Sequence, residues 1–213
     1  MPATMMHLVA ARTLSPGGSD AFLLGAILPD CVDAHRLLKD RVHFRDLPRE
    51  ERLPALIRFG KERDLRRDFD FGVLFHLYLD YLWDNGPQRE YRTRHGEEGW
   101  FPDYRKELAR AGSRAAPRAP WNRETWERLL GAEKNLYESD LPFPEEEIRS
   151  FLDFNARWHT EERLPESPYF TDRVVDDFIR SACLRFVAFL KEEFPLVPEE
   201  RKGDFAPFCA PGE

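Results

Sequence analysis

Hydrophobic residues occupy every side of one segment, residues 71–83, which reads Phe-Gly-Val-Leu-Phe-His-Leu-Tyr-Leu-Asp-Tyr-Leu-Trp. A helix that is apolar all round is a buried helix. Apart from its tyrosines, this segment contains only two ionisable residues, His76 and Asp80, which lie four positions apart and so share one face. An unpartnered carboxylate in such surroundings is costly. A metal ion would compensate for it, because an imidazole and a carboxylate at this spacing point to one place.

The rest of the chain repeats the helical pattern, and no segment alternates convincingly between polar and apolar residues. A first helix, opened by Pro2 or Thr4, is expected to end at the Ser-Pro-Gly-Gly sequence. A second apolar run ends at Pro29 and Asp30. This pattern predicts an all-α fold. Further helices are expected over residues 48–65, 124–137, 144–161 and 171–194, with loops over residues 111–120 and around His35 and His43.

The length of the chain favours one domain. Its 213 residues, of which 42% are hydrophobic, are enough for a sizeable core, and no break in composition divides them. The end of the sequence is rich in proline and charge and is expected to be extended. The sequence therefore predicts a single-domain multi-helix bundle, a metal-binding helical domain over residues 1–196, followed by a tail over residues 197–213.

The charge and the cysteines limit the partners and the location of the protein. A net charge of −7 and a pI near 5.5 oppose binding to duplex nucleic acid through a broad basic face. No apolar run approaches the roughly 18 residues of a membrane span, so stable membrane insertion is not expected. The three cysteines are far apart and no export signal is recognisable, which favours a cytoplasmic location. No feature of the sequence favours one oligomeric state.

Three other positions share the unusual surroundings of the buried helix. His7 lies within an apolar helix, Asp30 follows an apolar run, and His43 stands between two apolar residues. A single histidine on an apolar face is more often a hydrogen-bonded core residue than a ligand. Together, however, the four segments favour a metal site, whose candidate ligands are His7, Asp30, His43, His76 and Asp80. This mixture of imidazoles and carboxylates suits zinc, and iron or manganese less well.

Four short motifs in a fixed order resemble those of a known family. They are Met-x-His-Leu near the N-terminus, Phe-Leu-Leu-Gly-Ala-Ile-Leu-Pro-Asp at residues 22–30, Lys-Asp-Arg-Val-His-Phe-Arg at 39–45 and Gly-Val-Leu-Phe-His-Leu-Tyr-Leu-Asp at 72–80. The chain resembles the small bacterial branch of the zinc-dependent phospholipase C family, which is related in fold to the single-strand-specific zinc nucleases. The resemblance covers roughly the first 85 residues, and beyond them only the all-helical architecture is similar.

The resemblance implies a zinc-dependent hydrolase of phosphoric esters, with a phospholipid head group or another small phosphoester as substrate. In the family, zinc ions lie in a cleft between helices. Carried over by motif, Asp30, His43, His76 and Asp80 resemble the ligands of one zinc ion. His7 and Asp80 resemble ligands of its neighbour, so Asp80 would bridge the two ions. Asp30 and Asp80 are the expected catalytic residues, and Asp30 would also hold the attacking water.

The chain departs from the family pattern in two ways. The secreted phospholipases use their free N-terminal amino group as a ligand, whereas six residues precede His7 here. They also use an H-x-x-x-E pair for a third zinc ion, and the only histidine of this chain with an acid four residues later is His76. One or two ions are therefore expected. The remaining candidates for a second site are His35, His95 and His159, although their neighbours favour exposed positions.

Three arginines follow the predicted metal helix. Arg89, Arg92 and Arg94 are candidates for binding a substrate phosphate, because guanidinium groups donate paired hydrogen bonds to phosphate oxygens. Glutamates are interspersed among them, which makes a solvated turn the simpler interpretation.

Two other functions remain open. HD-type nucleotide phosphohydrolases are also all-helical and use His and Asp ligands, but none of the six histidines is followed by Asp. A non-catalytic helical binding module stabilised by metal ions would need the same ligands. An open coordination position would distinguish a hydrolase from such a module.

Overall fold

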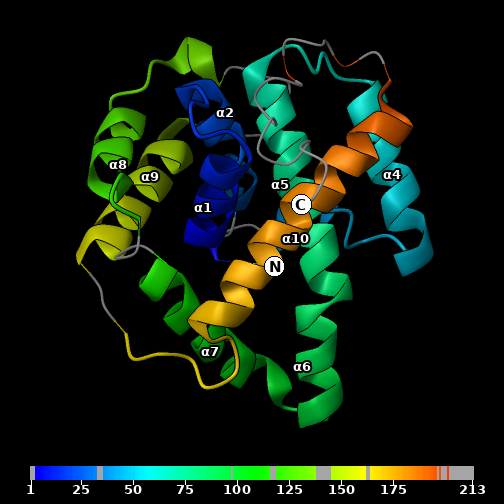
Figure 1. Ribbon diagram of the computed structural model, residues 1–213, viewed down its shortest axis with the longest axis vertical. Helices are drawn as coiled ribbons and strands as arrows, with labels where there is room; N and C mark the ends of the chain where they lie inside the picture. Colours follow the sequence, from blue (N-terminus) through cyan, green and yellow to red (C-terminus); the bar gives the residue numbers. More distant parts are fainter. Residues whose placement is uncertain are drawn as a thin grey trace, which may run out of the picture.

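The computed structural model describes residues 3–32, 36–96, 98–115, 119–137, 145–161, 164–195, 197 and 201. These residues form helices joined by short connections, and no strand occurs among them, which confirms the predicted all-α fold. The helix α5 (Asp68–Asn85) contacts most of the others, and α10 (Asp172–Glu193) runs diagonally across the bundle (Figure 1). The other elements are α1 (Thr4–Leu14), α2 (Asp20–Gly25), η1 (Leu28–Val32, a 3-10 helix), α3 (Arg36–Val42), α4 (Arg49–Lys61), α6 (Pro87–His95), α7 (Trp100–Ala115), α8 (Asn122–Leu130), η2 (Lys134–Leu136, also 3-10) and α9 (Glu145–Glu161).

The hydrophobic core is gathered around α5, as its uniformly apolar sequence predicts. Every residue from Phe69 to Asp80 is buried. Phe75 and Tyr78 pack against Phe186 of α10, with ring centroids 4.9 and 5.5 Å apart. Each buried side chain of this size stabilises the fold by roughly 1.5–3 kcal/mol. Apolar packing therefore holds α5 in place without a contribution from its polar residues.

The helices α2 and α5 cross with their backbones almost in contact. A Cβ atom at Gly25 would lie 2.2 Å from the Phe69 carbonyl oxygen, and one at Gly72 would lie 2.3 Å from the Phe22 carbonyl oxygen. Both positions therefore require glycine. The crossing brings the turn after α2, which contains Ala26, against the middle of α5.

Two segments predicted to be loops are helical instead. Residues 36–42, just before His43, form α3, and residues 111–115 form the last part of α7. The pattern of apolar residues misses α3 because Lys39 is charged, yet it is the buried residue among those of α3 whose side chains the structure describes, at 6% exposed. The end of α7 was missed because its buried residues are small, and such a stretch of alanine, glycine and serine reads as a loop.

The predicted tail lies almost entirely outside the described residues. Val197 packs against the hydrophobic core. The Arg201 guanidinium donates a hydrogen bond of 2.6 Å to the Arg66 carbonyl oxygen and lies 4.6 Å from the centre of the Phe71 ring. These two residues thus contact the helical domain.

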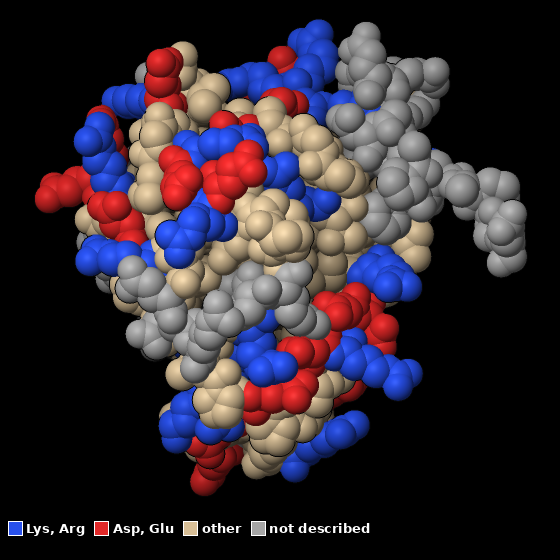
Figure 2. Space-filling view, turned by 60° about the vertical axis from the view of Figure 1, so that its left-hand side comes forward, with Lys and Arg blue, Asp and Glu red and all other residues tan. Residues whose placement is uncertain are grey.

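Charges of both signs are mixed on the molecular surface. Figure 2 shows lysine and arginine side chains next to acidic ones across the face in view, without a continuous basic area. Within the described part of the chain, no helix is both long and apolar enough to cross a membrane.

Candidate metal centre

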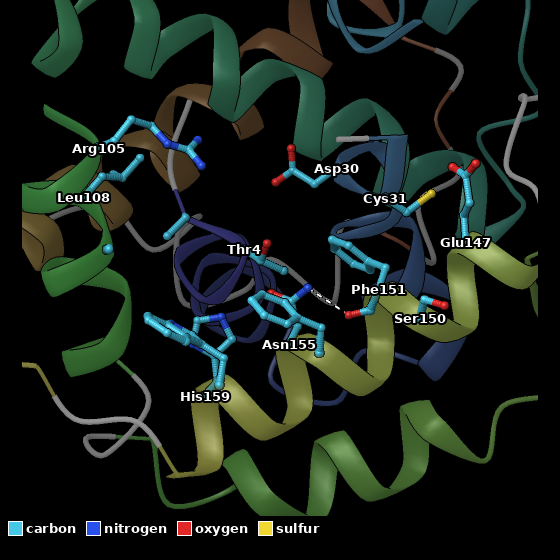
Figure 3. Close-up of a pocket in the computed structure, with 14 residues that line it drawn as sticks. Thr4, Asp30, Cys31, Arg105, Leu108, Glu147, Ser150, Phe151, Asn155 and His159 are labelled. Carbon is cyan, nitrogen blue, oxygen red and sulfur yellow. Dashed lines mark hydrogen bonds between the residues drawn. The ribbon is translucent and has the colours of Figure 1, made fainter. Parts of the chain in front are cut away.

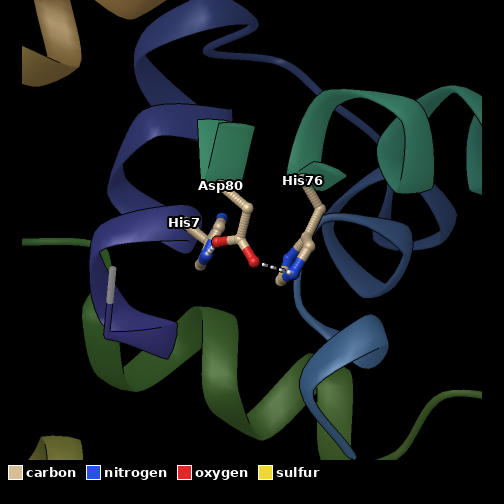
Figure 4. Close-up of side chains that lie close together, drawn as sticks. All are labelled: His7, His76 and Asp80. Atoms are coloured by element: carbon tan, nitrogen blue, oxygen red, sulfur yellow. Dashed lines mark ion pairs between the residues drawn. The ribbon is translucent and has the colours of Figure 1, made fainter. Parts of the chain in front are cut away.

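The five candidate ligands lie together in the interior, although they come from four segments. His7 belongs to α1, Asp30 belongs to η1, and His43 directly follows α3. The remaining two, His76 and Asp80, are one turn apart on α5. Each of the five residues is less than a tenth exposed. Figure 4 shows the carboxylate of Asp80 next to the side chains of His7 and His76.

Backbone carbonyls fix the tautomers of two of these histidines. The Nδ1 atom of His43 lies 2.8 Å from the Lys39 carbonyl oxygen. The Nδ1 atom of His76 lies 2.8 Å from the Ala26 carbonyl oxygen. Because a carbonyl oxygen only accepts, each Nδ1 atom carries the proton and donates it. In a neutral imidazole this leaves Nε2 with a lone pair, which is the state that binds a metal ion.

The two lone pairs face each other. His43 Nε2 lies 3.2 Å from His76 Nε2. Burial lowers the pKa of His43, and it lowers the pKa of His76 to about 3, so both rings are neutral near pH 7. Two converging lone pairs repel each other unless a cation lies between them. No other feature of the site points as directly to a metal ion.

Asp80 and Asp30 complete the group of donor atoms. The Oδ2 atom of Asp80 lies 3.3 Å from His43 Nε2 and 3.9 Å from His76 Nε2. The Oδ1 atom of Asp30 lies 3.7 Å from His43 Nε2. His7 contacts the other oxygen of Asp80, with its Nε2 atom 3.1 Å from Oδ1. Donor atoms of four residues thus lie around His43 Nε2 and His76 Nε2, and His7 contacts the second oxygen of Asp80.

The position of His7 is fixed mainly by packing. Its ring stacks on that of His76, with centroids 3.8 Å apart and planes inclined by 13°. Neither ring nitrogen makes a well-directed hydrogen bond with a described residue. The lone pair of His7 therefore remains available to a ligand.

The donor set fits a divalent ion that accepts nitrogen and oxygen ligands. In a tetrahedral zinc site with bonds of about 2.0–2.1 Å, neighbouring donor atoms are about 3.3 Å apart. The distances from His43 Nε2 to His76 Nε2 and to Asp80 Oδ2 are 3.2 and 3.3 Å. Two groups of three ligands share His76: one adds His7 and Asp80, and the other adds Asp30 and His43. Because His76 offers a single lone pair, two ions would have to share the oxygens of Asp80 instead.

Two cationic side chains lie at the site although the pattern of the sequence does not indicate them. Lys39 Nζ lies 3.2 Å from Asp30 Oδ1. The Arg45 guanidinium contacts Asp80 Oδ2 at 3.0 Å and Asp84 Oδ2 at 3.0 Å. The carboxylates are therefore partly compensated by the protein itself. A helix over residues 36–42 would have placed Lys39 one turn before His43, so recognising α3 would have placed Lys39 on the side of the helix that carries His43.

These cations keep the two carboxyl groups ionised. Burial alone would raise the pKa of Asp30, but Lys39 and the neighbouring imidazoles outweigh it and hold the pKa below its ordinary value. Burial opposes ionisation of Asp80 as well, yet His7, His43 and Arg45 hold its pKa well below the ordinary value. Both groups are therefore in the anionic form that binds metal ions.

A strained residue separates His43 from Arg45. Phe44 has φ = 56°, in the left-handed region that residues other than glycine seldom adopt. Its ring packs edge-on against Phe59 of α4, with centroids 6.1 Å apart. The turn ends α3 and lets both neighbours of Phe44 reach Asp80. Strain of this kind is concentrated at functional sites.

The three arginines predicted to bind substrate lie in different surroundings. They are exposed on α6, which extends away from the centre of the bundle toward the lower end of Figure 1. Arg92 lies over the Trp100 ring, and Arg94 lies over the Tyr169 ring, at 5.9 and 5.5 Å from the centroids. These contacts are with aromatic rings, and the role of Arg89, Arg92 and Arg94 in substrate binding stays a prediction.

The three remaining histidines differ in their surroundings. His35 lies outside the described residues. His95 is exposed, as expected, and its Nδ1 atom donates to the Tyr91 carbonyl oxygen at 2.8 Å. His159 is only 4% exposed, so the prediction that it lies on the surface is wrong. It belongs to a buried stripe of α9 that includes Leu152 and Ala156, a helical spacing that its immediate neighbours do not reveal.

Comparison with known proteins finds no matching family model, no matching curated protein and no matching solved structure. The resemblance to the zinc-dependent phospholipase C family therefore rests on the motifs of the sequence, and function has to be argued from the site itself.

Proposed function

We propose that this protein is a metal-dependent hydrolase of phosphoric esters and that zinc is its ion. The observation that carries the proposal is the pair of buried lone pairs on His43 and His76, 3.2 Å apart and flanked by two carboxylates. Asp30, His43, His76 and Asp80 would surround the ion, three of them binding it and leaving its fourth position to water, and His7 would support Asp80 or hold a second ion. When bound, a divalent ion supplies Lewis acidity and lowers the pKa of a coordinated water toward neutrality.

The residues around the ligands orient them and set the charge of the site. The carbonyls of Lys39 and Ala26 hold the two Nε2 atoms toward the centre. The carboxylate of Asp30 would orient an attacking water by accepting a hydrogen bond from it. The Lys39 ammonium beside it favours an anionic phosphoryl group. Arg45 acts on Asp80 and fixes the direction of its carboxylate.

An opening at Asp30 favours a hydrolase over a purely structural metal site. A structural zinc ion is normally enclosed by its protein ligands, whereas a catalytic one keeps a position for water or substrate. Asp30 lines a cavity of about 540 Å³ as well as the ligand cluster. One side of the cluster is therefore within reach of a small molecule.

Metal analysis followed by a substrate screen tests this function. Protein purified without added metal and then dialysed against zinc should bind about one ion per chain. His43→Ala and His76→Ala should lose the ion, whereas His95→Ala, which removes an exposed histidine, should keep it. The zinc-loaded protein should then hydrolyse 4-nitrophenyl phosphate or bis(4-nitrophenyl) phosphate. Failure of the wild type to bind zinc contradicts the proposal, and zinc without hydrolysis favours a structural ion.

A further inference from the structure

A cavity between α7 and α9 adjoins the candidate metal centre at Asp30 (Figure 3). Its volume of about 540 Å³ lies within the range of about 300–1,000 Å³ that is usual for small-molecule sites. The first residues of α1, Ala3 and Thr4, form part of its wall. The cavity is therefore large enough for a substrate and reaches the residues that would act on it.

One wall of the cavity is aromatic. Phe151, Phe154 and Trp158 come from one side of α9, and Leu108 and Ala109 come from α7. Phe154 is 62% exposed, which is unusual for a phenylalanine. Its ring lies 6.2 Å from that of Trp158, with the planes inclined by only 17°. Exposed, nearly parallel rings of this kind offer a surface on which a flat aromatic group can stack.

The same cavity contains a cation without a counter-ion. Arg105 of α7 forms no ion pair and no side-chain hydrogen bond with any residue that the structure describes. Figure 3 shows its guanidinium group directed toward Asp30. The N-terminal end of α1 adds to this positive potential, because Ala3 provides no side-chain cap for the first N–H groups. Together these groups oppose the negative charge of Asp30 and Glu147, which also line the cavity, and favour an anion on the side where Arg105 lies.

A buried polar group also lacks a partner at the cavity. His159 lines it, is 4% exposed, and its Nδ1 atom has no hydrogen-bond partner among the described residues. Buried polar atoms are nearly always hydrogen-bonded, so an unsatisfied one beside a cavity points to a missing ligand or water.

We propose that this cavity binds the organic part of the substrate and that this part is a flat aromatic ring joined to a phosphoryl group. The ring stacks on Phe154 and Trp158, while Arg105 and the N-terminal end of α1 bind the phosphoryl oxygens beside Asp30. The phosphoryl group in this inference rests on the proposed function, since the cavity alone specifies an apolar ring and an anion.

Binding of two phosphonates tests the inference without any hydrolysis, because their carbon–phosphorus bond is not cleaved. Isothermal titration calorimetry would compare phenylphosphonate with methylphosphonate, which carries the same anionic group without the ring. Both titrations are run on zinc-loaded protein and on protein in EDTA. Wild type should bind phenylphosphonate at least about tenfold more tightly, since its ring can stack on the rings of Phe154 and Trp158.

Matched variants locate the binding site. Phe154→Ala should abolish the preference for phenylphosphonate and leave methylphosphonate binding unchanged. Arg105→Gln should weaken both ligands about tenfold, because a charge-assisted hydrogen bond is lost. The controls are Phe101→Ala and Arg180→Gln, which remove an exposed phenylalanine and an exposed arginine that do not line the cavity and should have no effect.

Each outcome decides between the two proposals. Loss of the preference in Phe154→Ala but not in Phe101→Ala supports the cavity assignment, and it does so even if the protein binds no zinc. Equal affinity of wild type for the two phosphonates, or equal losses in the cavity variants and their controls, overturns it. That result does not test the proposed zinc binding and phosphoester hydrolysis, because those are measured separately.

Discussion

Gly25 and Gly72 face each other where α2 crosses α5, and a Cβ atom on Gly25 would lie 3.0 Å from the Gly72 Cα atom. This contact sets the distance between the turn after α2 and the buried face of α5. The hydrogen bond from His76 Nδ1 to the Ala26 carbonyl oxygen lies across it. The backbone packing of two helices thus determines the tautomer and the orientation of a candidate metal ligand.

Substitution of Gly72 tests this coupling. Gly72→Ala forces α2 and α5 apart, and overpacking of this kind costs roughly 1–3 kcal/mol. The melting temperature should fall by several degrees, and the affinity for zinc should fall with it because His76 loses its backbone acceptor. Differential scanning calorimetry and zinc titration measure the two effects. Gly131→Ala is the control, since a Cβ atom there meets its neighbours only at ordinary contact distances. Full zinc affinity in Gly72→Ala would contradict the coupling.

The contacts of Asp80 predict that its loss does the greatest damage to metal binding. Asp80 lies close to three histidines and to Arg45, whereas His7 reaches the site only through Asp80 Oδ1 and by stacking on His76. Asp80→Asn should weaken zinc binding by more than the 10–100-fold typical even of residues that only support a ligand. His7→Ala should weaken it less.

The comparison is made by counting bound zinc per chain, with Asp103→Asn, an exposed aspartate on α7, as the control. If His7→Ala and Asp80→Asn lose equal amounts of zinc, the central role of Asp80 is wrong. The site then depends on His7 as much as on α5.

Lys39 should compete with the metal ion. Its ammonium group lies 3.2 Å from Asp30 Oδ1 and compensates a carboxylate that the ion would also need. In Lys39→Met, the free protein should melt at a lower temperature, because a buried carboxylate loses its partner. Zinc affinity should rise about tenfold, since one competing positive charge is removed. Arg180→Met removes an exposed cation and serves as the control. A fall in zinc affinity would mean that Lys39 positions Asp30 for the ion.

The apolar pattern was sufficient to predict the class of the fold and the place of its central helix. His76 and Asp80 could be recognised as candidate ligands because polar residues are rare in a buried helix and need a partner there. Lys39 and Arg45 could not, since both lie after the apolar run that ends at Asp30, in a stretch whose charged residues resemble a loop. The burial of His159 was missed for a related reason, because helical spacing and not the adjacent residues decides which side of α9 is covered.

The cavity also could not be predicted from the sequence. Its lining comes from α1, η1, α7 and α9, which are far apart in the chain, and α7 was not predicted at all. Arg105 is one of many exposed arginines until the fold places it opposite Asp30 (Figure 3). The cavity could not be predicted because contacts between helices that are distant in the sequence form it, whereas the candidate ligands could be recognised from their local surroundings.

Removal of the metal should destabilise the protein. An ion that binds only the folded state contributes about 4.1 kcal/mol when its free concentration is 1,000 times the Kd. For a chain of this size, each kcal/mol shifts the melting temperature by roughly 2–4 °C. EDTA should therefore lower the melting temperature by about 8–16 °C relative to zinc-loaded protein, and added zinc should restore it. Identical melting curves after verified removal of zinc would show that no ion binds to the folded state.

Acid should destabilise the protein through His159 in particular. Burial lowers the pKa of this imidazole to about 3, whereas in the unfolded chain it is about 6.5. Below the unfolded value, the unfolded state binds a proton that the folded state does not. The stability contributed by neutral His159 is thus complete above pH 6.5 and decreases as the pH falls, by about 1.4 kcal/mol per pH unit. The decrease ends near the folded pKa.

His159→Phe removes this linkage and keeps a ring that can stack on Trp126, as His159 does at a centroid distance of 6.0 Å. Urea unfolding in EDTA at several pH values between 4 and 7 would be compared for wild type, His159→Phe and the exposed control His95→Phe. His43 and His76 titrate equally in all three proteins, so their contribution cancels in the differences. The stability of wild type should fall more steeply with acid than that of His159→Phe, and His95→Phe should follow wild type. Parallel curves for wild type and His159→Phe would mean that His159 is protonated in the folded state, which requires an anion beside it in the cavity.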